Sequence, residues 1–164
     1  MTRPPAPFRL ACAAALACAV LFATGCGPRR LPGTEIPDND DTRAILQSIE
    51  TYRQAMERRD AGAVLALVAP EYFDGSGTPD PADDLDRVRL EQQLPQDLAR
   101  MEGLRLDMKV RDIQVEADHA RAEFTFDAYY RVTTPSGPIA RRDTDVHQMT
   151  LRRVGGRWLI TSGL

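Results

Sequence analysis

Three polar side chains alternate with their neighbours in the stretch DTDVH, near the end of the chain. Asp143, Asp145 and His147 are two residues apart, so in a β-strand they would share one face. A carboxylate beside an imidazole can move protons, and a tyrosine such as Tyr130 can donate a hydrogen bond to a reacting group. The pattern suggests acid–base chemistry, with His147 as acid or base and either aspartate orienting it or acting itself.

A second interpretation is that DTDVH is a solvated strand end. Two aspartates beside Arg141 and Arg142, a few residues from the turn-like stretch TTPSGPI, are typical of exposed strand ends. The sequence favours this interpretation, and it leaves the catalytic residues open.

Four aromatic side chains could form the wall of a pocket for an apolar ligand: Tyr72, Phe73, Tyr130 and Trp158. Tyr72 and Phe73 follow a predicted helix, and Trp158 shares the inward parity of Ile160. For these three residues the sequence favours a structural place in the core, with ligand contact as the alternative.

No pattern of metal ligands or cofactor-binding residues stands out in the sequence. The stretch PDPADDLD lacks the spacing, glycine and glutamate of a calcium loop, and it suits the start of a helix. The sequence contains no phosphate-binding glycine loop, nucleophile elbow or zinc motif. We therefore predict neither a metal nor a cofactor.

The elements that must position these residues begin with helices. In TRAILQSIETYRQAMERRD, four apolar side chains recur at helical spacing and predict about five turns, capped by Asp41 or Thr42. The four are Ile45, Ile49, Tyr52 and Met56. A short helix capped by Asp60 follows. LDRVRLEQQLPQDLARM predicts a third, which Pro95 should kink or divide and Gly103 should end.

From Leu104 onward the apolar period changes to two, which is typical of strands. The phase slips between Val110 and Ile113, and this predicts a β-bulge at 111–112. Two further long strands follow, and the pair Gly155–Gly156 predicts a tight hairpin turn before the last strand.

The register of the central hairpin depends on where its turn lies. A turn centred at 136–137 would pair Phe124 with Met149 and would face the three polar residues of DTDVH inward. Burying a charge costs several kcal/mol unless it is paired or hydrated. These residues should therefore line a wet cavity or lie where the sheet extends beyond its helices.

Helices followed by a bulged antiparallel meander predict an α+β fold, with N-terminal helices on a curved sheet. Two stretches, IETYRQAMERRDAGAVLALVAPEYFD and VHQMTLRRVGGRWLITSGL, resemble nuclear transport factor 2-like domains. The resemblance covers about residues 41–164 and implies a cone-shaped domain of polyketide-cyclase-like kind. Family members include isomerases, cyclases, dehydratases, oligomerisation modules and lipoproteins, so the resemblance leaves the function open.

The first 25 residues predict a lipoprotein signal peptide. A short cationic start precedes an uncharged stretch, Leu10 to Thr24, which is too short to cross a bilayer comfortably. The following ATGC resembles a bacterial lipobox, in which Cys26 receives lipid and becomes the new N-terminus. An ordinary signal cleaved elsewhere, or an uncleaved anchor, is the alternative.

Residues 26–40, rich in proline and glycine, predict a flexible tether, and residues 41–164 a single domain. Because residues 1–25 carry two arginines and no acid, their removal changes the net charge from −3 to −5. An acidic chain without a basic cluster argues against nucleic-acid binding.

These features predict a lipid-anchored protein of the cell envelope. Resemblance to envelope lipoproteins in the residue after the lipidated cysteine, Gly27, favours the periplasmic face of the outer membrane, with the inner membrane as the alternative. The expected function is non-catalytic binding of a small apolar ligand or a protein partner. The alternative is an acid–base enzyme of isomerase, cyclase or dehydratase type. By resemblance, a homodimer through the outer sheet face is also expected, with Tyr129 as a candidate contact.

Overall fold

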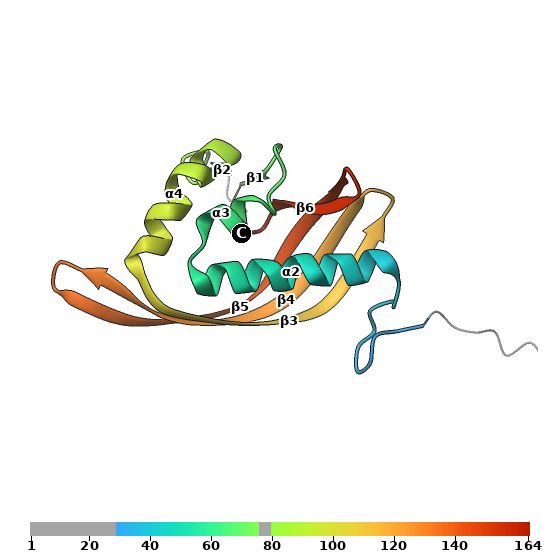
Figure 1. Cartoon of the computed structure of the whole chain (residues 1–164), viewed down its shortest axis with the longest axis horizontal. Helices are drawn as coiled ribbons and strands as arrows, with labels where there is room; N and C mark the ends of the chain where they lie inside the picture. The colour runs from blue at the N-terminus through green and yellow to red at the C-terminus, as the bar shows by residue number, and fades with distance from the viewer. Residues whose placement is uncertain (1–28, 76–79) are drawn as a thin grey trace, which may run out of the picture.

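The computed structural model describes residues 29–75 and 80–164, so Cys26 and the predicted signal peptide lie outside the described residues. Helices α2 (Asp40–Arg58), α3 (Ala61–Leu65) and α4 (Arg87–Arg100) lie on one face of a curved antiparallel sheet (Figure 1). The sheet order is β3-β4-β5-β6, which joins strands that are consecutive in the chain. The predicted α+β fold is confirmed.

The strands of this sheet differ greatly in length. They are β3 (Met101–Glu116), β4 (His119–Thr134), β5 (Gly137–Val154) and the much shorter β6 (Arg157–Ser162). The two-residue strands β1 (Phe73–Asp74) and β2 (Leu85–Asp86) form a separate small sheet near α4. The end of the β4–β5 hairpin extends beyond the rest of the fold (Figure 1), because β3 pairs with β4 only as far as Val132.

Helix α2 buries the apolar stripe that the sequence predicts. Ile45, Ile49 and Tyr52 are buried, and Met56 packs against the same core. The helix begins earlier than predicted, because Asn39 is its N-cap and accepts a hydrogen bond from the Thr42 backbone N–H. Thr42 is the reciprocal member of this capping box rather than the cap itself.

Part of the predicted tether packs on the domain. Residues 29–39 form a loop in which the Leu31 backbone N–H donates to the Ile36 carbonyl, and Ile36 is only 1% exposed. Ile36 belongs to the same apolar cluster as Ile45. The chain therefore makes core contacts before the first predicted helix.

Of the two predicted effects of Pro95, division of the third helix is wrong, since α4 runs unbroken through it. Pro95 is exposed, so water can hydrate the carbonyl that loses its helical hydrogen bond. The predicted cap Asp60 is confirmed on α3, where its side chain accepts from the Ala63 N–H. Gly103 lies inside β3 rather than after the helix, with φ of 62° at a shift of register.

Two of the predicted strand features are confirmed. A register shift between Val110 and Asp112 places the bulge at Arg111. The turn before β6 consists of Gly155 and Gly156, both with positive φ. No helix within residues 29–75 and 80–164 is long and apolar enough to cross a membrane.

The predicted register of the β4–β5 hairpin is wrong by two residues. The turn lies at Pro135 and Ser136, so Phe124 pairs with His147 instead of Met149. Proline fixes φ near −65°, which suits the first central position of a tight turn and draws the turn toward Pro135. A shift of two residues keeps every side chain on its predicted face.

Candidate functional site

A cavity of about 390 Å³ lies on the concave side of the sheet, between α2 and the three long strands. Most of its lining is apolar: Met56, Met101, Leu104, Leu106, Met108, Phe124, Phe126 and Ala128. The alternation of β3 and β4 produces this lining, because every second side chain faces α2. The volume is in the range of small-molecule sites.

The polar residues of the cavity come mainly from one strand. Asp143, Asp145 and His147 line it in a row along β5, and Tyr130 reaches it from β4. The inward orientation predicted for these residues is therefore confirmed, although their roles stay predictions. The cavity has one apolar wall and one polar wall, as an amphiphilic small molecule would require.

His147 lies between two phenylalanine rings. Its ring is edge-on to Phe124 and Phe126, at centroid distances of 5.8 and 6.4 Å. The Nε2 atom is buried and has no hydrogen-bond partner among the described residues. A buried ring nitrogen without a partner is costly, so Nε2 is a ready contact for a polar group of a ligand.

Tyr130 and Asp143 form a hydrogen-bonded pair at the cavity. The Tyr130 hydroxyl donates to Asp143 Oδ2 at 2.6 Å, and this bond to a carboxylate raises the pKa of Tyr130. Asp145 makes no such pair with His147. Its Oδ1 instead accepts from the backbone N–H of Val146 at 2.7 Å.

The structure brings only one of the four predicted ligand-binding aromatics, Tyr130, to this cavity. Tyr72 is 2% exposed in the core, whereas Phe73 is 54% exposed on β1. Trp158 is buried away from the cavity, where its Nε1–H donates to Asp41 at 3.3 Å and Arg153 stacks on its ring. These three residues do not line the cavity, so the cavity does not support their predicted contact with a ligand.

Two polar residues of this region carry no functional signal in the sequence. Tyr52 lines the cavity, and burial raises its pKa to about 12. Asp74 accepts the Gly163 N–H at 2.8 Å and, after burial, is the next cause that raises the pKa of Tyr72. Asp74 and His147 also border an adjoining hollow of about 430 Å³. The sequence predicts Tyr52 only as a member of the apolar stripe of the first helix, and no sequence pattern marks Asp74 as a site residue.

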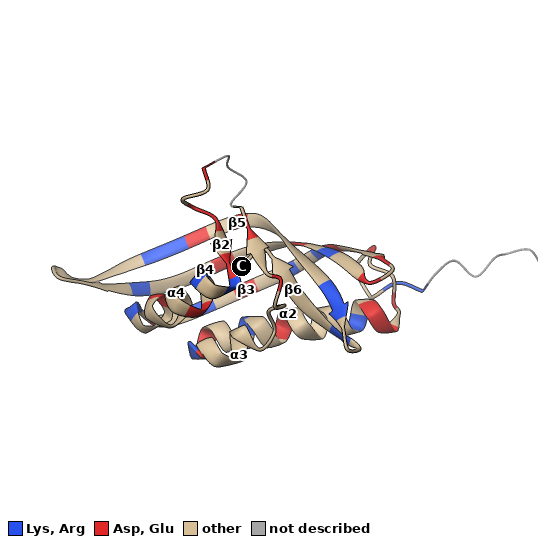
Figure 2. Ribbon diagram, turned by 90° about the horizontal axis from the view of Figure 1, so that it is seen from above, with Lys and Arg blue, Asp and Glu red and all other residues tan. Residues whose placement is uncertain are grey.

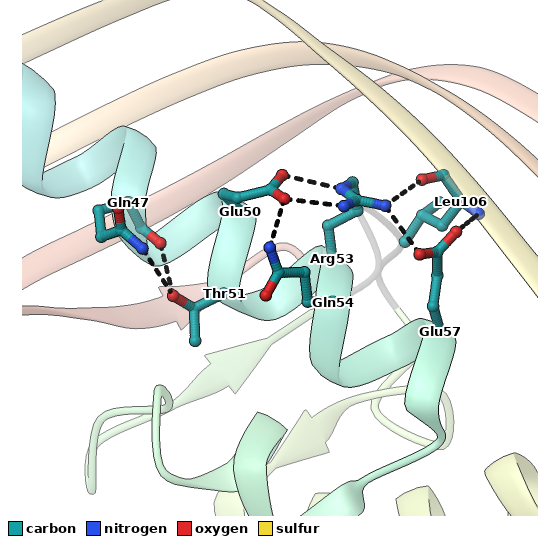
Figure 3. Close-up of polar contacts among 7 residues, drawn as sticks. All are labelled: Gln47, Glu50, Thr51, Arg53, Gln54, Glu57 and Leu106. Atoms are coloured by element: carbon teal, nitrogen blue, oxygen red, sulfur yellow. Dashed lines mark hydrogen bonds and ion pairs between the residues drawn. The ribbon is translucent and has the colours of Figure 1, made fainter.

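A polar network fixes α2 over the cavity (Figure 3). Arg53 binds Glu50 and Glu57 and donates to the Leu106 carbonyl, while the Leu106 N–H donates to Glu57 at 3.0 Å. The hydrogen bond to Arg53 is the main reason that the pKa of Glu50 is lowered to about 2. The network holds the helix that carries Tyr52 and Met56 against β3.

Over residues 29–75 and 80–164, no three histidine, cysteine or carboxylate side chains are close enough together to hold a metal ion. The side chains that line the cavity can support binding and proton transfer.

Comparison with solved structures identifies the fold as nuclear transport factor 2-like. A ketosteroid isomerase-like protein from Erwinia carotovora atroseptica is 18% identical with a TM-score of 0.62, covering 76% of this chain and 94% of that one. A candidate dehydratase of the nuclear transport factor 2-like family from Streptomyces avermitilis is 18% identical with a TM-score of 0.59, covering 75% and 93%. A candidate scytalone dehydratase from Novosphingobium aromaticivorans is 16% identical with a TM-score of 0.60, covering 75% and 80%.

These identities establish the shared fold alone. Neither a family model nor a curated protein matches the sequence. Any activity must therefore be argued from the cavity of this chain.

Proposed function

We propose that this protein binds a small, mainly apolar molecule in the cone cavity, without transforming it. The cavity itself is the observation that carries the proposal. It has an apolar wall from β3 and β4, and the unpartnered Nε2 of His147 lies in its polar wall. A ligand with one hydroxyl or carbonyl group would fit, since its polar atom can pair with His147 while the remainder replaces water on the apolar wall.

The proposal includes attachment to the cell envelope through lipid on Cys26, which the sequence supports through ATGC and the preceding apolar stretch. The mass of the mature chain tests this part. A mature chain that begins with lipidated Cys26 would support it, provided that the Cys26→Ser variant is absent from the membrane fraction. A mature chain that begins elsewhere and carries no lipid would contradict it.

A cavity-filling variant tests ligand binding. Ala128 is 8% exposed and lines the cavity, so Ala128→Leu should fill part of it. The full chain and this variant would be extracted in lipid nanodiscs from the cells that make them, and the retained small molecules would be compared by mass spectrometry. Ala44→Leu, on the exposed side of α2, is the matched control.

We expect a molecule that co-purifies with the wild type and with Ala44→Leu but is lost from Ala128→Leu. Identical small-molecule content in all three samples would contradict a cavity ligand. Because every sample carries the same nanodisc lipids, only the difference between variants counts.

A second candidate function is acid–base catalysis in the same cavity. The observation that favours it is the meeting of three proton-transfer groups at one wall, namely His147, Asp145 and the Tyr130–Asp143 pair. The retained molecule would be incubated with wild-type protein and with His147→Leu and followed by NMR. Conversion by the wild type alone would favour catalysis. An unchanged molecule would favour binding.

A further inference from the structure

The outer edge of β5 is open over much of its length. β4 pairs with β5 throughout, but β6 pairs only with residues 150–154. Residues 138–146 are all exposed, and the end of the β4–β5 hairpin extends beyond the helices (Figure 2). A strand edge of this kind presents backbone N–H and C=O groups that can pair with another strand.

The opposite edge of the sheet is partly covered. Along β3, Arg59 donates to the Met101 carbonyl at 2.7 Å, and Arg53 and Glu57 satisfy the carbonyl and the N–H of Leu106. Side chains therefore satisfy backbone groups of β3 at two positions, whereas the described residues supply no such contact to residues 139–145 of β5.

Two features show which backbone groups face this edge. The Val146 N–H is taken up by the Asp145 carboxylate instead of by β4, so it points outward. Pro138, which has no N–H, occupies a position of the same parity, as a proline in an edge strand must. Because direction alternates along a strand, the N–H groups of Ala140, Arg142 and Thr144 also point outward.

On either side of these three N–H groups lies a position that cannot donate to a partner strand, and we call the stretch between them the window. Pro138 has no N–H at one end, and at the other end the Val146 N–H is already bonded to Asp145. Arg142 lies at the centre of the window, equally distant in sequence from Pro138 and Val146. A window that is symmetric about one residue suits a partner strand of identical sequence running in the opposite direction.

We infer that the β5 edge pairs with the β5 edge of a second copy of this chain, antiparallel, with the two-fold axis at Arg142. Arg142 then lies opposite Arg142 of the second copy, and Ala140 lies opposite Thr144. In this register each of the three outward N–H groups meets a carbonyl of the other copy. A register shifted by two residues would keep the three donors paired, but it would place Arg141 opposite Arg141, or Asp143 opposite Asp143, of the second copy.

The charges support the same register. Arg141 would lie directly opposite Asp143 of the second copy, twice about the axis, and side chains at such a pair are within contact distance. The like-charged Arg142 side chains at the axis are each neutralised within their own copy, because Arg142 binds Asp127 through two hydrogen bonds of 2.9 and 2.6 Å. Charge complementarity therefore argues for a second copy rather than an unrelated strand.

Pairing at this edge would also reach the cavity. Asp143 holds the Tyr130 hydroxyl and lines the cavity, so Arg141 of the second copy would sit beside its polar wall. The contact is short, and it belongs to the weak class of interfaces. Attachment of both copies to one membrane, as the proposed function includes, would raise their effective concentration and favour the pair.

Disulfide cross-linking tests the register. Two cysteines at position 142 would have Cα atoms about 5.5 Å apart, within the range of a disulfide. At position 144 they would be about 14 Å apart, too far to bridge. Arg142→Cys and Thr144→Cys are matched, because both side chains contact Asp127. The full chain in its membrane would be oxidised mildly, with the unsubstituted chain as the control for the three native cysteines.

We expect a covalent dimer for Arg142→Cys above the level of the unsubstituted chain, and none above that level for Thr144→Cys. Equal yields from both variants, or no dimer from Arg142→Cys, would overturn the proposal. A dimer through the outer sheet face, near Tyr129, would also remain uncross-linked at 142 and would overturn it.

Charge reversal gives an independent test by sedimentation of the full chain in detergent. Arg141→Asp and Asp143→Arg each create like charges opposite one another, and each should raise the dissociation constant about tenfold. The double variant restores opposite charges and should return the constant to within about threefold of the wild type. If both single variants remain folded and the double variant does not restore association, the proposed pairing is overturned. That result would not bear on the proposal of ligand binding.

Discussion

The hydroxyl of Tyr130 reaches Asp143 diagonally across the β4–β5 hairpin, with a 2.6 Å hydrogen bond. In the observed register Asp143 pairs with Ala128, and Tyr130 pairs with Arg141. Diagonal neighbours on one face of a sheet lie within reach of long and aromatic side chains. The polar wall of the cavity therefore includes a hydrogen bond between diagonal neighbours on the two strands, and not only contacts between directly paired residues.

Replacing His147 should change ligand binding more than stability. Its Nε2 is buried and has no partner among the described residues, so His147→Leu removes an unsatisfied polar atom and keeps a similar volume. We expect the free energy of unfolding in urea to stay the same or rise by about 1 kcal/mol, while ligand retention falls. His119→Leu, at an exposed turn, is the control. A loss of more than about 2 kcal/mol would mean that His147 is a satisfied core residue.

Gly163 should tolerate no side chain. A Cβ there would lie 2.1 Å from the Gln148 carbonyl oxygen and 2.9 Å from the Met149 Cα, and φ is 88°. Gly163→Ala must displace backbone, and we expect a loss of more than about 3 kcal/mol in urea unfolding. Gly156→Ala has a similar φ of 79° but no atom within 4 Å, so it should cost only about 1 kcal/mol. Equal losses would show that the backbone conformation, and not the close approach, dominates.

The Glu57 carboxylate should matter more to stability than the Glu50 carboxylate. Glu57→Ala leaves the Leu106 N–H without its acceptor, and we expect a loss of about 1–3 kcal/mol. Glu50→Ala removes a partner of Arg53 whose side chain is 45% exposed, so the loss should stay below about 1 kcal/mol. Urea unfolding of both variants at pH 7 measures the difference. The reverse order would show that β3 does not depend on this contact.

Alkaline pH should destabilise the fold through Tyr52. Burial raises its pKa from 10.0 to about 12, so the folded state holds this proton more tightly than the unfolded state. The resulting stability is complete below pH 10 and is lost as the pH rises through 12, at no more than about 1.4 kcal/mol per pH unit. The pKa values of Tyr72 and Tyr130 are also raised and act in the same direction, so the contribution of Tyr52 is measured as a difference between variants.

Urea unfolding between pH 9 and 12 would measure this effect, with Tyr52→Phe as the comparison. The variant should lose less stability over this range than the wild type, because the residue can no longer ionise. Tyr129→Phe, which removes an exposed hydroxyl, should leave the wild-type slope unchanged. Identical slopes for Tyr52→Phe and the wild type would contradict the assignment.

The sequence by itself determined the elements and the faces of their side chains. Apolar spacing in the first helix, the phase slip at Arg111 and the paired glycines before β6 are local signals, and each is present in the structure. The inward face of Asp143, Asp145 and His147 followed from the period of two, which a register error of two residues does not alter. This is why the polar wall could be predicted although the pairing of Phe124 could not.

Only the tertiary structure decided which residues meet. Tyr52 and Asp74 are brought to the cavity region by the packing of α2 and by the close approach of Gly163 to β5, contacts between segments far apart in the chain. Trp158 and Tyr72 have inward or core positions but lie away from the cavity. The sequence pattern predicts which side of the sheet a side chain faces, but not where along the sheet it lies. The open edge of β5 likewise depends on where β6 stops pairing, and alternation within one strand carries no information about its neighbour's length.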